Sequence, residues 1–197
     1  VPKRAVPALA ESWQQNAREV VMDNAFEKIG VISYKKSKYA NWFIVGNFVF
    51  FLAIGIIAIL ASDSFSHNRL NGAWCLLGCL GYIVLHEIVH LMFMRLFSKN
   101  ALHFSIQFPT ISVGSSAKYR KLQFIVIALA PAVLLGIFLT IMLALSAKEH
   151  AFFWAMLLTL NFAGSGGDYL QVFATRKYPA STFFQDNSVE TAVYKKK

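Results

Sequence analysis

The residues with the clearest chemical potential in this sequence are His86, Glu87 and His90, in the pattern His-Glu-Ile-Val-His. On an α-helix, residues at i and i+4 project from one face, so the two imidazoles can bind one metal ion together. Glu87 lies beside them, close enough to take a proton from a water molecule that the same zinc ion activates. The pattern therefore predicts Zn²⁺ at His86 and His90, with Glu87 as the general base of a hydrolysis.

The motif lies within an apolar stretch, residues 72–97, that is long enough to cross a membrane. Ionisable groups are costly at membrane depth, and three of them close together there indicate a function. The alternative is structural: the two histidines are buried and bonded to neighbouring helices, with Glu87 as an ion-pair partner. The apolar setting favours the metal site over this alternative.

Four apolar stretches are each long enough to span about 30 Å of hydrocarbon at 1.5 Å per residue. They are residues 41–61, 72–97, 122–145 and 151–173. Hydrophobic residues make up 56% of the chain, outside the usual range of soluble proteins. The sequence thus predicts an α-helical integral membrane protein with about four transmembrane helices. Residues 41–173 would form the membrane domain, between an amino-terminal segment, 1–40, and a polar tail, 174–197.

Basic residues are distributed very unevenly around these stretches. Of the 19 Lys and Arg residues, 17 lie before the first stretch, from Arg95 at the end of the second stretch to Lys121, or after the fourth, and two lie in the other connections. The positive-inside rule then places both termini and residues 98–121 in the cytoplasm of a multi-pass plasma-membrane protein. The net charge of +9 has no accompanying basic stripe interleaved with aromatic residues, so nucleic acid is not a predicted partner.

The amino-terminal 40 residues show a weak amphipathic pattern that ends in a basic cluster. Its apolar positions include Leu9, Trp13, Val20 and Ile29, and the cluster is Lys35, Lys36 and Lys38. The pattern predicts a helix beside the membrane that touches anionic headgroups of the lipid bilayer. Docking of a partner is the alternative.

Between the second and third stretches, apolar residues alternate with polar ones from Leu102 to Phe108, and Pro109 interrupts the pattern. Alternation with period two predicts a strand, and Ile111 and Val113 suit its return partner. We expect a short cytoplasmic β-hairpin. A substrate could pair with an exposed strand around Phe104 and Ile106 and so be held in extended form; an ordinary amphipathic hairpin is the alternative.

A catalytic zinc usually has three protein ligands, so one must come from outside the motif. Asp168 is the only other acidic residue within an apolar stretch, and it follows the Gly164-Ser165-Gly166-Gly167 segment. Its depth below the predicted cytoplasmic edge matches that of His90. Asp168 as a helix-end residue and His103 as the third ligand both remain open. Asn161, which is neutral and deeper, is predicted to hydrogen-bond substrate, and Cys75 and Cys79 to be small packing residues.

These motifs resemble those of the site-2 protease class of intramembrane metalloproteases. The sequence is more closely similar to small bacterial membrane proteins grouped as putative zincin peptidases, over residues 72–194. The resemblance rests on the His86–His90 motif, the strand-like segment, the Asn161–Asp168 element and the tail around Pro179 and Asp186. It implies that Asp168 is the third zinc ligand and that Asn161 holds the substrate backbone. Site-2 proteases typically have a Pro and an Asp-Gly in that element, whereas this chain has Gly164 and Asp168-Tyr169.

Two functions from different classes follow from these observations. The first is an intramembrane zinc endopeptidase that hydrolyses a peptide bond of a membrane-tethered protein or peptide. The second is a catalytically silent metal-binding membrane protein, such as a sensor, a partner subunit or a transporter. Glu87 favours the first, because a binding site does not need a carboxylate beside its ligands and hydrolysis needs a base.

Overall fold

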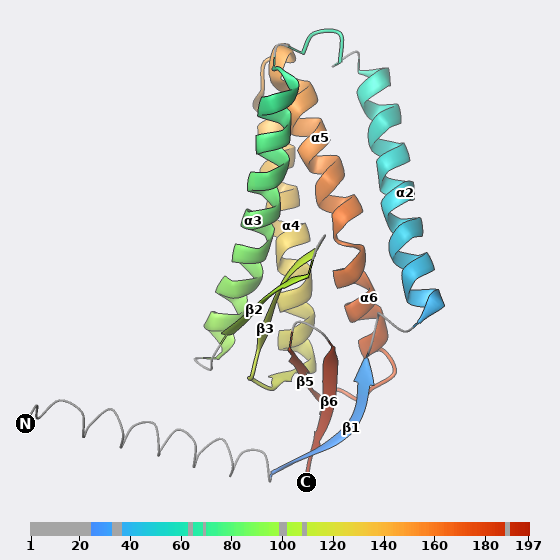
Figure 1. Cartoon of the computed structure of the whole chain (residues 1–197), viewed down its shortest axis with the longest axis vertical. Helices are drawn as coiled ribbons and strands as arrows, with labels where there is room; N and C mark the ends of the chain where they lie inside the picture. Colours follow the sequence, from blue (N-terminus) through green and yellow to red (C-terminus); the bar gives the residue numbers. More distant parts are fainter. Residues whose placement is uncertain are drawn as a thin grey trace, which may run out of the picture.

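The computed structural model describes residues 25–32, 37–62, 65–68, 70–98, 102–107, 110–187 and 190–197. For residues 102–107 and 110–113 it describes the backbone only. The described chain is mostly helical, with an upright helical bundle and short strands gathered at one end (Figure 1).

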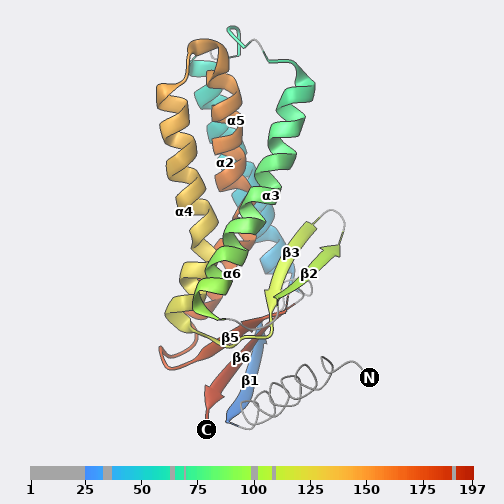
Figure 2. The same cartoon turned by 90° about the vertical axis from the view of Figure 1, so that its left-hand side faces the viewer.

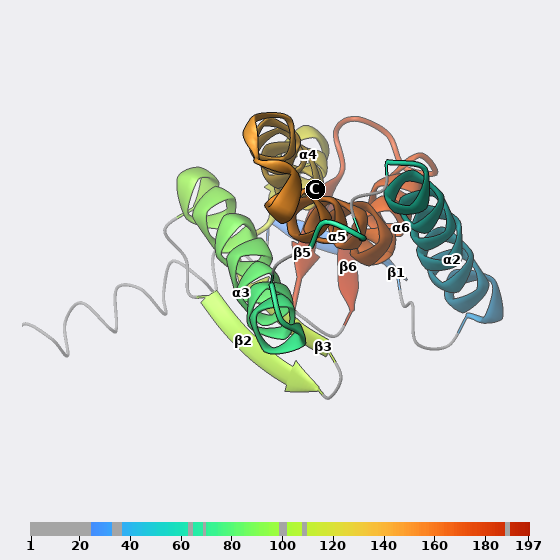
Figure 3. The ribbon, with the colours of Figure 1, turned by 90° about the horizontal axis from the view of Figure 1, so that it is seen from above.

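Three helices are long and apolar enough to cross a membrane: α2 (Lys38–Ala61), α3 (Gly72–Phe97) and α4 (Lys121–Leu145). The fourth predicted span is not one helix. It is divided into α5 (Lys148–Gly164) and α6 (Gly166–Thr175), with Ser165 between them. Seen from above, α2 and α3 lie on opposite sides of α5 (Figure 3).

Local sequence signals set several helix ends. Ser37 caps α2 by accepting a hydrogen bond from the Ala40 backbone, and Asn71 caps α3 by accepting one from Trp74. At the start of α4, the Gln123 side chain accepts a hydrogen bond from the Arg120 backbone. These polar caps flank long apolar sequences, so the boundaries of α2 to α4 fall within a few residues of those predicted.

A four-stranded antiparallel sheet joins distant parts of the chain in the order β1-β6-β5-β4. Its strands are β1 (Phe26–Ile32), β4 (Tyr119–Arg120), β5 (Phe183–Asp186) and β6 (Thr191–Lys196). The amphipathic helix predicted for residues 1–40 is wrong at Ile29, which lies in β1; Leu9, Trp13 and Val20 fall outside the described residues. Pairing with β6, more than 150 residues away, decides the conformation of this segment, and a local pattern cannot reveal such a partner.

The predicted hairpin is confirmed. β2 (Leu102–Gln107) pairs antiparallel with β3 (Thr110–Ser115), so that Phe104 faces Val113 and Ile106 faces Ile111 across the ladder. Figure 2 shows this pair beside the lower half of α3, above the four-stranded sheet.

Two clusters of buried apolar residues hold the bundle together, one beside the four-stranded sheet and one among the helices. The first joins the ends of α3 and α4 to the sheet through Met94, Phe124, Phe184 and Val193. The second packs α3, α4 and α5 against one another through Tyr82, Val89, Leu135 and Leu157. The histidine motif lies on α3 between Tyr82 and Met94, so both clusters fix the helix that carries it.

Candidate metal centre

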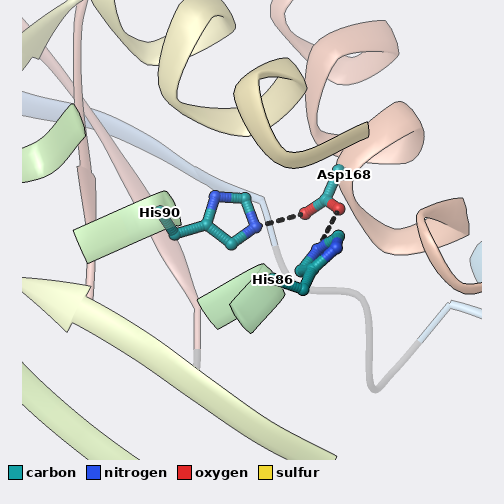
Figure 4. A group of neighbouring side chains, drawn as sticks. All are labelled: His86, His90 and Asp168. Atoms are coloured by element: carbon teal, nitrogen blue, oxygen red, sulfur yellow. Dashed lines mark hydrogen bonds and ion pairs between the residues drawn. The ribbon is translucent and has the colours of Figure 1, made fainter. Parts of the chain in front are cut away.

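The structure brings His86, His90 and Asp168 together, although 78 residues separate His90 from Asp168 in the sequence. The Nε2 atom of His86 lies 3.2 Å from Oδ2 of Asp168, and Nε2 of His90 lies 3.4 Å from Oδ1 (Figure 4). All three side chains are largely buried, with exposed fractions between 12% and 14%. One helix, α3, supplies both imidazoles, and the first turn of α6 supplies the carboxylate.

The donor set and its spacing fit a zinc ion. Zinc binds imidazole nitrogen and carboxylate oxygen at about 2.0–2.1 Å, so tetrahedral ligand atoms lie roughly 3.3–3.5 Å apart. The three candidate ligand atoms lie within 4.8 Å of one another. The nitrogen–oxygen separations of 3.2 and 3.4 Å, each to a different oxygen of Asp168, are close to the tetrahedral value. Three protein ligands leave a fourth position, as catalytic zinc sites do.

His90 is oriented by a backbone carbonyl of the neighbouring helix α4. Its Nδ1 atom lies 2.9 Å from the carbonyl oxygen of Ile127. A carbonyl can only accept, so Nδ1 carries the proton and the Nε2 lone pair is free for a metal. In a regular helix this carbonyl would accept from residue 131, but residue 131 is proline and has no N–H.

His86 is oriented by side chains instead. Its Nδ1 atom lies 3.0 Å from the hydroxyl oxygen of Tyr82, and that hydroxyl donates to Oδ1 of Asn161 at 3.0 Å. The Asn161 amide in turn donates to the Ala132 carbonyl at 2.9 Å. Both histidines therefore have a partner at Nδ1 and direct Nε2 towards Asp168.

Asp168 is placed by the break between α5 and α6. Three backbone carbonyls before the break accept hydrogen bonds from side chains. Ser165 Oγ donates to the Asn161 carbonyl, and Nδ2 of Asn47 in α2 donates to the Phe162 and Ala163 carbonyls. The helix restarts at Gly166, so Asp168 lies in the first turn of α6. A carboxylate is favoured there by the free N–H groups and the dipole of a helix start.

Glu87 follows His86 on α3 and is partly buried. Within the described ranges its carboxylate makes no hydrogen bond or ion pair. A carboxylate held near a metal centre and not engaged by other groups can accept a proton from a water molecule there.

A family model described as "Putative zincin peptidase" matches residues 79–183, a little over half of the chain. The chain belongs to this family. The matched region contains His86, Glu87, His90 and Asp168, all of the hairpin β2–β3, and the broken helix. No curated protein and no solved structure matches the chain.

The other predicted site residues of this family member lie in different surroundings. Phe104, Ile106 and the alternative ligand His103 are in β2, where the structure describes backbone only, so their roles stay predictions. Cys75 and Cys79 are free thiols, partly buried in α3, and Cys79 packs on the second core cluster, the one that contains Tyr82 and Leu135.

Asn161 is fully buried, and both ends of its amide are bonded within the protein. The sequence-based assignment of Asn161 to substrate binding stays untested, but the side chain faces Tyr82 and not an open surface.

Three residues that contribute to the site were missed from the sequence, although each left a signal. Tyr82 is four residues before His86, so it lies on the same helical face as the motif. Asn47 is a polar amide inside a long apolar stretch, and Pro131 interrupts another. Within apolar helices, polar side chains can bond backbone groups and prolines can leave them without a helical partner. Here Asn47 donates to two backbone carbonyls, and Pro131 leaves the Ile127 carbonyl without its helical donor.

Proposed function

We propose that this protein is an intramembrane zinc endopeptidase that hydrolyses a peptide bond of a membrane-tethered protein or peptide. The observation that carries the proposal is the convergence of two Nε2 atoms, from a helix able to span a membrane, with the Asp168 carboxylate. Glu87 lies beside them, and its carboxylate makes no hydrogen bond or ion pair with the described residues. Membership of the zincin peptidase family supports the same reaction class.

In this proposal His86, His90 and Asp168 hold the zinc ion, which when bound polarises the substrate carbonyl and makes water acidic enough to react near neutral pH. Glu87 accepts a proton from the attacking water and later returns it to the leaving amine nitrogen. Asp168 contributes a negative charge that offsets part of the charge of the dication. The low exposure of the three ligands limits access of bulk water.

The substrate must be extended at the bond that is cut, because an α-helix shields its peptide bonds. We propose that it pairs with the β2–β3 hairpin, with Phe104 and Ile106 as contact residues. In the described part of the chain this hairpin forms a two-stranded sheet of its own, and no other described strand pairs with it. Addition of a strand to such a sheet is a common way of binding an extended peptide. β3 contacts α3, the helix that carries the motif.

We also propose that both termini and residues 98–121 face the cytoplasm of a plasma-membrane protein. The four-stranded sheet supports this, because β1, β4, β5 and β6 pair with one another and must lie on one side of the membrane. These strands come from residues 1–40, 98–121 and 174–197, which together hold 16 of the 19 basic residues. In Lys195→Cys, at an exposed position, the new thiol should react with a membrane-impermeant maleimide only after cells are opened. Labelling of this position in intact cells would show that the topology is the opposite of the one proposed.

The proposed function is tested by Glu87→Gln, which keeps both imidazoles but cannot accept the proton of water. Purified protein would be reconstituted in liposomes with a panel of single-span membrane proteins, and cleavage followed by mass spectrometry. We expect one zinc per chain in both proteins and at least about a 100-fold loss of cleavage rate in the variant. The matched control is Glu149→Gln, at an exposed position far from the site at the start of α5.

Two outcomes would contradict the proposal in different ways. Cleavage by Glu87→Gln at the wild-type rate would exclude Glu87 as the base. A wild-type protein that binds zinc but cuts none of the panel would favour the silent metal-binding function.

A further inference from the structure

The histidine ligands of a metal ion need a partner at the nitrogen that does not bind the metal. That partner fixes the tautomer and the ring orientation, and its loss typically weakens metal binding about 10-fold to 100-fold. For His86 the partner is a side chain, the hydroxyl of Tyr82, at 3.0 Å from Nδ1. Tyr82 is one turn before His86 on the same helix and is 7% exposed.

A tyrosine hydroxyl can both accept and donate, so by itself it does not decide which imidazole nitrogen carries the proton. Here Asn161 removes the ambiguity. Its Oδ1 atom can only accept, so the Tyr82 proton points to Asn161 and the hydroxyl oxygen is left to accept from His86 Nδ1–H. The direction of the Asn161 amide is set in turn by the Ala132 carbonyl, to which Nδ2 donates.

We infer that Asn161 and Tyr82 are positioning residues for the metal centre: Asn161 orients the Tyr82 hydroxyl, which holds His86 with Nε2 unprotonated and directed at the ion. The inference deepens the proposed function and differs from the assignment of Asn161 to the substrate backbone. Asn161 is fully buried and uses both ends of its amide for protein partners, so a substrate would have to displace one of them.

The test is the zinc affinity of purified protein without substrate, measured by competition with a chromogenic chelator. Tyr82→Phe removes only the hydroxyl and should lower the affinity about 10-fold to 100-fold. Asn161→Leu, of similar volume, should also lower it, by a smaller factor. In the double variant Asn161→Leu should add almost nothing to Tyr82→Phe, because it acts through the hydroxyl that is already missing.

The matched control is Tyr119→Phe, which removes another buried hydroxyl. This hydroxyl donates to the Met94 carbonyl at 3.3 Å and not to a histidine of the candidate centre. The control variant should leave zinc affinity unchanged. Wild-type affinity in Tyr82→Phe would overturn the inference, and so would independent, multiplying losses in the double variant. Because zinc is measured without substrate, a protein that passes this test and cleaves nothing would refute the proposed peptidase and leave the positioning roles intact.

A separate observation concerns His90 and the proline of α4. Pro131 has no N–H to donate to the Ile127 carbonyl, and its ring pushes the carbonyl four residues earlier out of line with the helix. This is the carbonyl that lies 2.9 Å from His90 Nδ1. We infer that Pro131 is a second positioning residue, because it frees the backbone acceptor that orients His90.

Pro131→Ala restores an N–H that competes for the Ile127 carbonyl. We expect zinc affinity to fall about 10-fold, the lower end for an outer partner of a ligand, while the thermal stability of the zinc-free protein stays equal or rises. Pro179→Ala, at an exposed site after α6, is the control and should change neither quantity. Unchanged zinc affinity in Pro131→Ala would refute this role, and so would a loss of affinity matched by a loss of zinc-free stability.

Discussion

The two sides of the metal centre are built in different ways. On one side, the uninterrupted helix α3 presents His86 and His90 by its own periodicity, one turn apart. On the other, Asp168 depends on a helix that stops at Gly164 and restarts at Gly166. The backbone of the first side needs only local helical structure, whereas the backbone of the second is bonded by side chains from elsewhere in the bundle.

The difference lies in how the backbone polar groups are satisfied. Within α3 each carbonyl has its partner four residues later, so no neighbour is required. At the break, the Asn161, Phe162 and Ala163 carbonyls receive side-chain donors, two of them from Asn47 of α2. In a proposed membrane span, where water is scarce, such donors have no easy replacement. Asp168 should therefore be sensitive to changes in α2, and the histidines should not.

The largest effect is expected from His86→Ala, which removes a ligand from the regular side. Zinc affinity should fall at least about 100-fold, above the 10-fold to 100-fold typical for an outer partner of a ligand. Helix content should not change, because alanine is a good helix former. Equilibrium dialysis against buffered zinc, with circular dichroism on the same samples, measures both. Retention of zinc would exclude His86 as a ligand.

A smaller loss is expected from Asp168→Ala, because both imidazoles remain. Zinc affinity should fall at least about 10-fold, the lower limit expected even for outer partners, and Asp168→Asn should be intermediate because its oxygen is neutral. His103→Ala is the matched comparison and should bind zinc as wild type does. If His103→Ala lost zinc and Asp168→Ala kept it, the third ligand would be His103.

A change in α2 tests the comparison itself. Asn47→Leu removes the donors to the Phe162 and Ala163 carbonyls and should destabilise the protein by about 1 kcal/mol, the order measured for hydrogen bonds between membrane helices. Zinc affinity should fall a few-fold, since Asp168 is less well placed. Asn41→Leu, at an exposed position of the same helix, is the control. Equal zinc affinity in Asn47→Leu and wild type would show that the break holds without α2.

The smallest effect is expected from Gly167→Ala, beside Asp168. A methyl group added there meets no atom within 4 Å, so it should fit, and alanine should raise stability by up to about 1 kcal/mol. Zinc affinity should stay at the wild-type value. Gly166→Ala is the contrast, because its methyl would lie 3.0 Å from Asn47 Nδ2 and 3.4 Å from the Ile44 Cα atom. Chelator competition and thermal unfolding of both variants would show whether close approach of α2 is the constraint.

The sequence alone identified the parts of this protein that depend on local periodicity. The spacing of His86 and His90 places them on one helical face, long apolar runs predict α2 to α4, and strict alternation predicts the β2–β3 hairpin. Each pattern is contained in a few turns or one hairpin, so no distant residue has to be known. Asp168 could be selected because it is the only other acidic residue in an apolar stretch.

Only the tertiary structure decided features that join distant segments. The pairing of β1 with β6 places Phe26–Ile32, part of the segment predicted as helix, and Thr191–Lys196 of the predicted polar tail in one sheet. At the break before Asp168, Asn47 of α2 donates to backbone carbonyls, and the histidines are in contact with Ile127 of α4 and, through Tyr82, with Asn161 of α5. Hydrogen-bond partners of this kind depend on which helices are neighbours, which no local pattern encodes. The candidate ligand residues can therefore be selected from the sequence, whereas the contacts that orient them follow from the packing of the bundle.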